Sequence, residues 1–315
     1  MKIFRHILAF CLLSASAHAF SAPEPISNPP DPNGPPPVLA EASQSPADEF
    51  EMFPIYPQLE TVQGAKTVKT YQMPDWATRC QYVIKTNGRP LKATVELWTG
   101  PIRRTHQMQI DSEDGQQTPF QATLKFKKLA QVLKIMTSST LEYPIQVGVS
   151  VPEPARAKEL AENTERVWDN LTEDEKLLVQ GGSTEGGGGA VRSWTIPTNV
   201  ASVQFLGWSR DSSKKSFRAQ IEVLQGPNNR KQVYTLQCGG GSQPYHAVIQ
   251  TPGPGWMIRV TNKKFVEDGL VHFGVTPYEV VGDGPTDIKP YNVVQNSATS
   301  IDTRTRGKGN KQWWE

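Results

Sequence analysis

The stretch Leu91-Lys-Ala-Thr-Val-Glu-Leu-Trp-Thr-Gly-Pro101 decides the fold, because the chain contains a second version of it, Phe217-Arg-Ala-Gln-Ile-Glu-Val-Leu-Gln-Gly-Pro227. The two versions align without a gap, and both keep an alanine, a glutamate and a final Gly-Pro pair at matching positions. Apolar residues alternate with polar ones in each version, which is the pattern of a strand with one face in the core. The sequence therefore contains the same strand and turn twice.

The repeat extends on both sides of this strand. Lys69–Pro74 matches Arg192–Pro197, and Ile145–Val149 matches Val271–Val275. The matches stay nearly collinear over about 80 residues, as expected for a true internal repeat. Both copies keep apolar residues, Gly, Pro and one Glu, but no set of reactive groups. The repeat therefore indicates a scaffold.

Short alternating runs fill the first copy, and turn signals such as Asn87-Gly88 and Asp114-Gly115 separate them. The runs cover residues 67–73, 80–86, 91–98, 103–110, 119–126, 131–137 and 143–151. Short strands joined by hairpin turns are typical of antiparallel sandwiches. The sequence predicts an all-β fold of two tandem antiparallel β-sandwich domains, residues 61–152 and 190–281, related by the internal repeat.

Residues 153–189, between the copies, predict a helical and glycine-rich linker. Pro154 to Trp168 has apolar residues at helical spacing. Thr172-Glu-Asp-Glu175 has the form of a capping box, which predicts a second short helix ending near Gln180. The glycine-rich run 181–189 then predicts a flexible joint.

The N-terminus has the features of a processing signal. A basic start, an apolar run over residues 7–15 and Ala17-His18-Ala19 predict a signal peptide, residues 1–19. The apolar run is too short to span a bilayer, so we expect no transmembrane segment. Cleavage leaves Phe20-Ser-Ala-Pro23, which resembles the presequences that direct proteins into the complex plastids of diatoms. Residues 20–60 are therefore predicted to be a plastid-targeting, Pro-rich disordered leader.

Composition narrows the classes of function. The chain has 33 Lys and Arg against 31 Asp and Glu, and loss of Lys2 and Arg5 with the signal balances the two. A near-neutral chain has no long-range field for nucleic acid, so no such partner is expected, and low net charge favours association. Cys80 and Cys238, which remain after Cys11 is lost, do not match across the repeat, so no disulfide framework is predicted.

No motif predicts an enzyme. Gly186–Gly189 lacks the Gly-Lys-Ser/Thr of a phosphate loop, and the histidines lack metal-ligand spacing. Glu96 and Glu222 occur in both copies, and two carboxylates are what a glycosidase needs. Cross-strand pairing on equivalent strands is the simpler interpretation. We therefore predict no catalytic residue, no cofactor and no metal site.

Residues 282–315 have no counterpart in the first copy and predict an extended C-terminal arm. The arm carries Arg304 and Arg306 and ends in Trp313-Trp314. Arginine and tryptophan are common anchors of protein interfaces, so these four residues are predicted to form a self-assembly interface. A tail folded back on its own domain is the alternative.

These features together resemble the diatom pyrenoid shell proteins: the Phe-type presequence, the Pro-rich leader, two copies sharing A-x-[VI]-E-[LV]-x-x-G-P, and the Trp-bearing tail. The resemblance covers roughly residues 20–315. It implies a structural protein in the chloroplast (complex plastid) stroma, at the pyrenoid periphery. Such a protein self-assembles into a closed sheet around the Rubisco matrix and supports CO2 concentration and fixation. Its partner is then itself, with the Rubisco matrix as a candidate second partner.

Two other functions remain open. A secreted carbohydrate-binding or adhesive β-sandwich protein would use tryptophans as sugar platforms. The candidates are Trp76, Trp98, Trp194, Trp208 and Trp256. A hydrolase or isomerase on a β-sandwich is the third function, and it has no recognisable set of residues.

Overall fold

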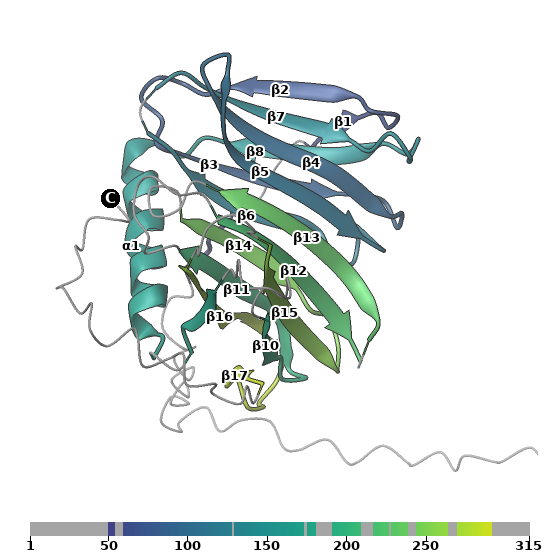
Figure 1. Ribbon diagram of the computed structural model, residues 1–315, viewed down its shortest axis with the longest axis vertical. Coiled ribbons are helices and arrows are strands. Elements are labelled where there is room, and N and C mark those ends of the chain that lie inside the picture. Colours follow the sequence, from purple (N-terminus) through teal and green to yellow (C-terminus); the bar gives the residue numbers. More distant parts are fainter. Residues whose placement is uncertain are drawn as a thin grey trace, which may run out of the picture. The chain divides into compact units, whose positions relative to one another are not determined.

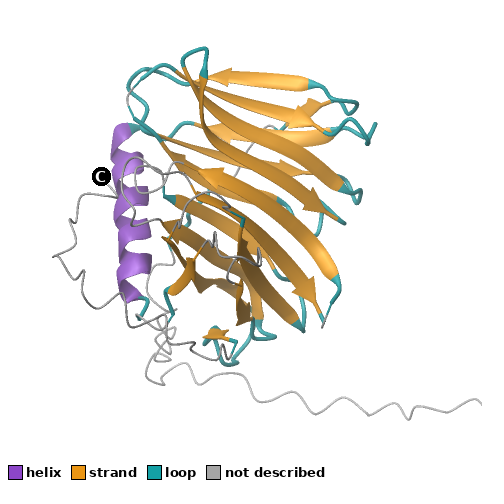
Figure 2. Cartoon of the chain, in the orientation of Figure 1, coloured by secondary structure: helices purple, strands orange, loops and turns teal. Residues whose placement is uncertain are grey.

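The computed structural model describes residues 50–53, 59–127, 129–172, 175–180, 191–208, 217–226, 228–238, 244–263 and 270–291. All of them lie in one compact unit that begins at Phe50. Within these ranges the chain forms strands and one helix (Figure 2), so the predicted all-β class is confirmed. The signal peptide, most of the leader and the glycine-rich joint lie outside the described residues.

Eight strands cover the first copy, and the seven predicted runs are all confirmed. The strands are β1 (Glu60–Val62), β2 (Val68–Gln72), β3 (Arg79–Lys85), β4 (Leu91–Thr99), β5 (Arg103–Ser112), β6 (Phe120–Lys125), β7 (Gln131–Thr137) and β8 (Ile145–Ser150). The sequence missed β1, because three residues are too few to show an alternating pattern.

Nine strands follow the single helix, α1 (Pro154–Asn170). They are β9 (Leu177–Gln180), β10 (Val191–Thr195), β11 (Val200–Trp208), β12 (Phe217–Gln225), β13 (Arg230–Cys238), β14 (Tyr245–Gln250), β15 (Trp256–Asn262), β16 (Leu270–Val280) and β17 (Lys289–Pro290).

The strands form two antiparallel sheets, and each sheet contains strands of both copies (Figure 1). The eight-stranded sheet has the order β1-β8-β3-β6-β14-β11-β16-β9. The nine-stranded sheet has the order β17-β10-β15-β12-β13-β5-β4-β7-β2. The copies meet where β6 pairs with β14 and where β5 pairs with β13.

The strand order is the same in the two halves. The first half reads β1-β8-β3-β6 and β2-β7-β4-β5, and the second half reads β9-β16-β11-β14 and β10-β15-β12-β13 from the opposite edge. Adding eight to each strand number of the first half gives the second. This order supports the internal repeat, which remains a prediction from the sequence.

The register of the strand pairing between the copies is symmetric. Ser112 pairs with Gln232 and His106 with Cys238, and these are corresponding positions exchanged between the two strands. Gln109 pairs with its own counterpart, Thr235. In the other sheet Ala122 pairs with its counterpart, Ala247. A pseudo-twofold axis therefore passes through both sheets at these two pairs.

One apolar core fills the space between the sheets and crosses this junction. Phe120 on β6 packs against Tyr234 on β13, with ring centroids 4.9 Å apart. His106 on β5 stacks on Tyr245 of β14 at 6.3 Å. Each contact joins the first copy to the second and one sheet to the other. The two copies therefore share their core as well as their sheets.

Helix α1, predicted as part of a linker, lies on the outer face of the eight-stranded sheet. Leu160 packs with Val248 of β14, and Trp168 packs with Leu206 of β11. Pro154 occupies the first turn, where its missing N–H needs no partner. The predicted helix over 154–168 is therefore confirmed and extends to Asn170.

The predicted second helix, from Thr172 to Gln180, is wrong. Glu175 does accept hydrogen bonds from the backbone N–H and hydroxyl of Thr172, at 2.8 and 3.0 Å, as in a capping box. The chain then continues as β9, which pairs with β16 over Leu177–Gln180. The open edge of β16 offers backbone partners along its whole length, and this tertiary pairing outweighs a local helix signal.

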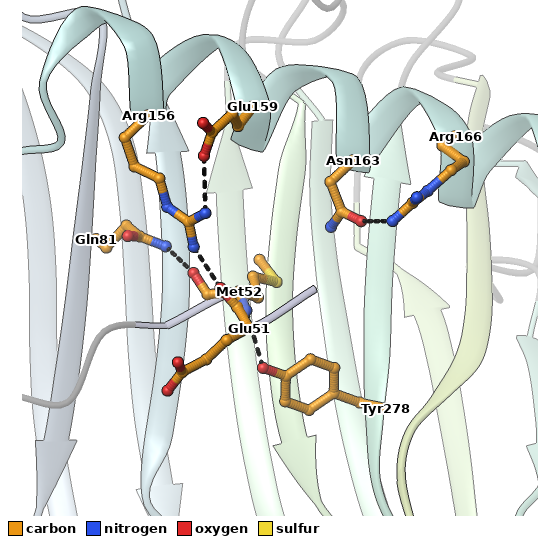
Figure 3. Close-up of polar contacts among 8 residues, drawn as sticks. All are labelled: Glu51, Met52, Gln81, Arg156, Glu159, Asn163, Arg166 and Tyr278. Atoms are coloured by element: carbon orange, nitrogen blue, oxygen red, sulfur yellow. Dashed lines mark hydrogen bonds and ion pairs between the residues drawn. The ribbon is translucent and has the colours of Figure 1, made fainter. Parts of the chain in front are cut away.

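Residues 50–53, at the end of the predicted leader, form a strap between α1 and the eight-stranded sheet (Figure 3). Gln81 of β3 donates to the carbonyl of Met52 at 2.7 Å, and the Met52 N–H donates to the Tyr278 hydroxyl of β16 at 3.1 Å. Arg156 of α1 donates to the carbonyl of Glu51 and pairs with Glu159 at 2.9 Å. This N-terminal strap therefore ties both copies to the helix.

The first ten residues of the predicted arm, 282–291, pack on their own chain. Ile288 is buried in the core, and β17 pairs with β10 through Lys289 and Pro290. The Tyr291 N–H donates to the carbonyl of Ser193 at 2.8 Å. The rest of the arm lies outside the described residues.

We expect Phe120→Ala to lower the free energy of unfolding by about 3–5 kcal/mol, because it empties a fully buried site at the junction. Urea unfolding followed by tryptophan fluorescence and by far-UV circular dichroism should show one coincident transition, since both copies share the core. The control, Val68→Ala at an exposed position, should change stability by less than about 0.5 kcal/mol. Two separated transitions would instead support two independently folding domains.

Candidate assembly interface

The sequence predicts that assembly is anchored by Arg304, Arg306, Trp313 and Trp314. All four lie outside the described residues. Candidate contact surfaces on the described part of the chain come from exposed apolar side chains and from open sheet edges. The exposed apolar side chains and the open sheet edges both differ between the two copies.

An exposed apolar patch lies on three loops at one end of the first copy. Trp76 is 46% exposed, Ile102 89% and Leu129 52%. Backbone hydrogen bonds hold these loops together, from Met73 to the Gln131 carbonyl at 2.9 Å and from Gly100 to that of Ala130 at 3.4 Å. We call Trp76, Ile102 and Leu129 the apolar end.

The second copy keeps the loop geometry of the apolar end but not its side chains. The corresponding backbone bonds run from Ile196 to Trp256, at 3.0 Å, and from Gly226 to Gly255, at 2.9 Å. At the positions of Trp76, Ile102 and Leu129 this copy has Asn199, Asn228 and Pro254. These three apolar side chains therefore occur in one copy, although the backbone beneath them occurs in both. The second copy instead exposes Val281 next to Asn199, since the Val281 N–H donates to the Asn199 carbonyl at 2.7 Å.

The sheet edges differ between the copies in the same way. β10, at the edge of the second copy, is covered by β17. Its counterpart β2 is the last strand of the nine-stranded sheet among the described residues, so its outward N–H and C=O groups form an open edge. Val68 on β2 is 47% exposed on this edge. The first copy therefore offers both an apolar end and an open strand.

Glu96 lies on the outer face of the nine-stranded sheet but is only 4% exposed. Arg104 donates to its Oε1 at 2.8 Å, Trp98 donates to its Oε2 at 3.0 Å, and Lys134 Nζ lies 3.8 Å from Oε2. The carboxylate therefore joins three neighbouring strands, β5, β4 and β7.

The second copy repeats this cluster at corresponding positions. Glu222 accepts from Arg230 at 3.3 Å and lies 3.5 Å from Arg259. Because both glutamates are held between basic side chains of adjacent strands, the cross-strand interpretation is confirmed. The pairs bind strands together and do not face a common substrate site, since they lie in different halves of the sheet.

The buried histidines and cysteines belong to the packed interior. His106 is buried, and burial lowers its pKa to about 3. His246 lies between Thr164 of α1, at 2.9 Å, and Gln204, at 3.1 Å, and burial with the nearby Arg79 charge lowers its pKa to about 3. Cys80 and Cys238 are buried, and burial raises the pKa of Cys80 to about 12. These positions indicate packing in the interior.

The tryptophans do not form a sugar platform on the described surface. Trp194 and Trp256 are buried in the core, and Trp208 packs against the α1 cluster. Trp98 donates to Glu96. Trp76 is the exposed member of the set, and it belongs to the apolar end.

Within the described ranges, no group of three or more His, Cys, Asp or Glu side chains could hold a metal ion. The helix in the described part of the chain is neither long nor apolar enough to cross a membrane.

We expect Glu96→Gln to lower the free energy of unfolding by about 1–3 kcal/mol, because Arg104 and Lys134 lose the charge that they share. Glu162→Gln, on the exposed face of α1, should change it by less than about 0.5 kcal/mol. Denaturant unfolding of the two variants measures the difference. Equal stability of Glu96→Gln and the parent chain would contradict the structural role of the cluster.

Acid should destabilise the fold through His106. Its pKa is about 3 when folded, against an ordinary value near 6.5, so the unfolded chain takes up a proton first as the pH falls. Between pH 6.5 and about 3, this histidine should cost up to about 1.4 kcal/mol of stability per pH unit. His106→Gln, which introduces the residue of the second copy, should make the pH dependence of unfolding shallower by that amount. An unchanged slope would show that His106 is not buried in its neutral form.

Comparison with known proteins places this architecture in a family. Comparison with curated proteins finds no match. Among solved structures, the vicilin from Solanum melongena is similar at 8% identity and a TM-score of 0.13, covering 76% of this chain and 80% of that one. A TM-score this low does not indicate a shared fold. Comparison with protein families matches residues 54–277 to the family described as diatom pyrenoid shell protein. Because this match spans most of the chain, including nearly all of both sheets, the chain belongs to the diatom pyrenoid shell protein family, whose members have a structural role in the pyrenoid.

Proposed function

We propose that this chain is a non-enzymatic protein that self-assembles into a sheet-like shell encasing the Rubisco matrix of the pyrenoid. The shell then supports CO2 concentration and fixation. The observation that carries the proposal is the difference between the copies: one end of the first copy exposes Trp76, Ile102 and Leu129, and the second copy has Asn199, Asn228 and Pro254 at the corresponding positions.

This difference favours an extended assembly over a closed dimer. A patch that occurs once per chain can contact a different surface on the next copy, and heterologous contacts of this kind build rings or open arrays. The open edge of β2 adds a second contact in the same half of the molecule, where an incoming strand can continue the nine-stranded sheet. Two directional contacts are the minimum for a two-dimensional sheet.

The arm beyond Tyr291 supplies a third candidate contact. Residues 282–291 are held by β10 and the core, so the following 24 residues start from a fixed point on the second copy. Arg304, Arg306, Trp313 and Trp314 then reach a neighbouring copy, where arginine and tryptophan side chains serve as anchors.

The proposed location is the chloroplast stroma of a complex plastid, at the pyrenoid periphery. It is supported by the family and by Phe20-Ser-Ala-Pro23 after the predicted signal peptide. The Rubisco matrix is the proposed second partner, because a shell at this location faces it. No described constellation of residues supports catalysis, and Glu96 and Glu222, the carboxylates common to both copies, are engaged in ion pairs.

We expect the purified chain, without residues 1–19, to form regular sheets or tubes by electron microscopy as its concentration rises near neutral pH. Ile102→Asp should abolish them, because it places a charge at the most exposed residue of the apolar end. The matched control is Asn228→Asp at the corresponding position of the second copy, which should still assemble. Circular dichroism should show that both variants are folded. Discrete monomers of the parent chain at every concentration would contradict the proposed function.

We also expect a chain that ends at Tyr291 to keep its fold and to lose ordered assembly. This truncation retains Ile288 and β17, so it leaves the core intact. The Arg304→Ala, Arg306→Ala, Trp313→Ala, Trp314→Ala variant removes the proposed anchors while keeping the full length. Sheets formed equally well by both variants would reject the arm as an assembly contact, and the apolar end would remain the candidate.

A further inference from the structure

The two outer faces of the sandwich differ in what covers them. Helix α1 and the N-terminal strap lie on the outer face of the eight-stranded sheet. No described helix or strap packs on the outer face of the nine-stranded sheet, which carries the two glutamate clusters. We call this uncovered surface the basic face.

Positive side chains outnumber negative ones on the basic face. On its central strands β4, β5, β7, β12, β13 and β15 and their ends, alternation and ion pairing place seven basic and four acidic residues on it, which leaves three positive charges in excess there. The basic residues are Lys92, Arg104, Lys134, Arg218, Arg230, Lys231 and Arg259, and the acidic residues are Glu96, Asp111, Glu113 and Glu222.

The two buried glutamates do not cancel this excess. Each is shared by two basic side chains, so each cluster keeps one positive charge. The outer members of the clusters remain accessible, since the side chains of Arg104 and Arg230 are 36% and 58% exposed. The excess charge is therefore presented to solvent, where an anionic partner can reach it.

A shallow hollow of about 460 Å³ lies near the middle of the basic face. Lys66, Thr94, Ser138 and the ion pair of Lys92 with Asp111, at 3.1 Å, line it, next to Gln109 on the pseudo-twofold axis. The second copy has longer side chains at corresponding positions, with Gln220 for Thr94 and Lys263 for Ser138. The hollow therefore occurs on the first-copy side of the face, and Lys66 adds a positive charge to its hydroxyl groups and the ion pair.

The chain itself contains a segment of opposite charge. Residues 20–49 include five acidic residues and no Lys or Arg. The acidic residues are Glu24, Asp31, Glu41, Asp48 and Glu49. Because the folded part carries the basic residues and this segment carries none, the two are complementary in charge.

We propose that the acidic leader, residues 20–49 of one copy, docks on the basic face of a second copy. The strap, Phe50–Phe53, directly follows the leader and is held on the outer face of the eight-stranded sheet, which is not the basic face. Thirty residues rich in proline reach about 90 Å at 3.1 Å per residue, enough to cross to a neighbour. This inference rests on the self-assembly in the proposed function, and it adds the surface and the segment that join the copies.

Zero-length carbodiimide crosslinking, which joins a carboxylate to a lysine in direct contact, tests the docking. Equal amounts of ¹⁵N-labelled and unlabelled chain, both beginning at Phe20, are mixed, assembled, crosslinked and digested for mass spectrometry. We expect Glu24, Asp31 and Glu41 of one label, which lie farther from the strap, to link to Lys92 and Lys134 of the other. Links within one label only, or links to Lys158 on α1 instead, would overturn the proposal.

Matched variants separate the basic face from general charge effects. Arg218→Gln and Arg259→Gln leave the reporting lysines in place, and each should lower the yield of mixed-label links about two- to five-fold, as expected for loss of one exposed charge pair. Lys158→Gln, on the exposed side of α1, should leave the yield unchanged.

The outcomes distinguish this inference from the proposed function. Regular sheets without mixed-label leader links would overturn the docking and leave the shell function standing. Monomers at every concentration, without mixed-label links, would contradict both. Mixed-label links that are equally abundant in the Arg218→Gln and Arg259→Gln variants would show that the leader contacts a neighbour elsewhere, and would overturn the basic face as its site.

Discussion

The pairing of β5 with β13, together with that of β6 with β14, is the constraint on which the rest of the structure depends. Each copy alone would leave two open sheet edges, with unpaired N–H and C=O groups beside an apolar core. Joining the copies edge to edge satisfies both edges at once and lets Phe120 and Tyr234 pack across the junction. The shared core, the position of α1 and the clusters around Glu96 and Glu222 all follow from these two ladders.

The junction also explains why one helix and one short strap are enough to complete the fold. α1 and residues 50–53 contact β3 of the first copy and β14 and β16 of the second. A brace across both copies stabilises the sandwich where a longer chain would otherwise be needed. The opposite sheet has no such brace among the described residues, and its glutamate clusters hold neighbouring strands together instead.

Much of this fold could be predicted from the sequence, because alternation over five or more residues is a strong local signal. All seven runs of the first copy became strands, and Pro154 with its apolar stripe became α1. The errors lie in segments whose structure is decided by tertiary contacts. Leu177–Gln180 has local helix signals but pairs with β16, and Met52 and Ile288 are buried although their segments lack periodicity. The pairing of the two copies into shared sheets has no local signal, since it depends on which edges meet.

The candidate interface was harder to predict for a related reason. Ile102 and Leu129 lie in turns, and the sequence of a turn differs little between exposed and buried turns. The significance of these two residues appears when each is compared with its counterpart, Asn228 or Pro254. Pairs such as His106 with Gln232 were visible as differences between the copies, but burial of the histidine was not. Arg304, Arg306, Trp313 and Trp314 remain a prediction.

The symmetric register at Gln109 and Thr235 has a consequence for the surfaces of the two copies. Two separate single-copy chains could pair through the same ladder, because each chain would use the same edge strand to bind the other. A homodimer whose subunits are fused through α1 would have this arrangement. Fusion removes the requirement that both subunits have identical surfaces, so one half can have Trp76, Ile102 and Leu129 where the other has Asn199, Asn228 and Pro254. A symmetric dimer cannot have that difference, and a fused one can.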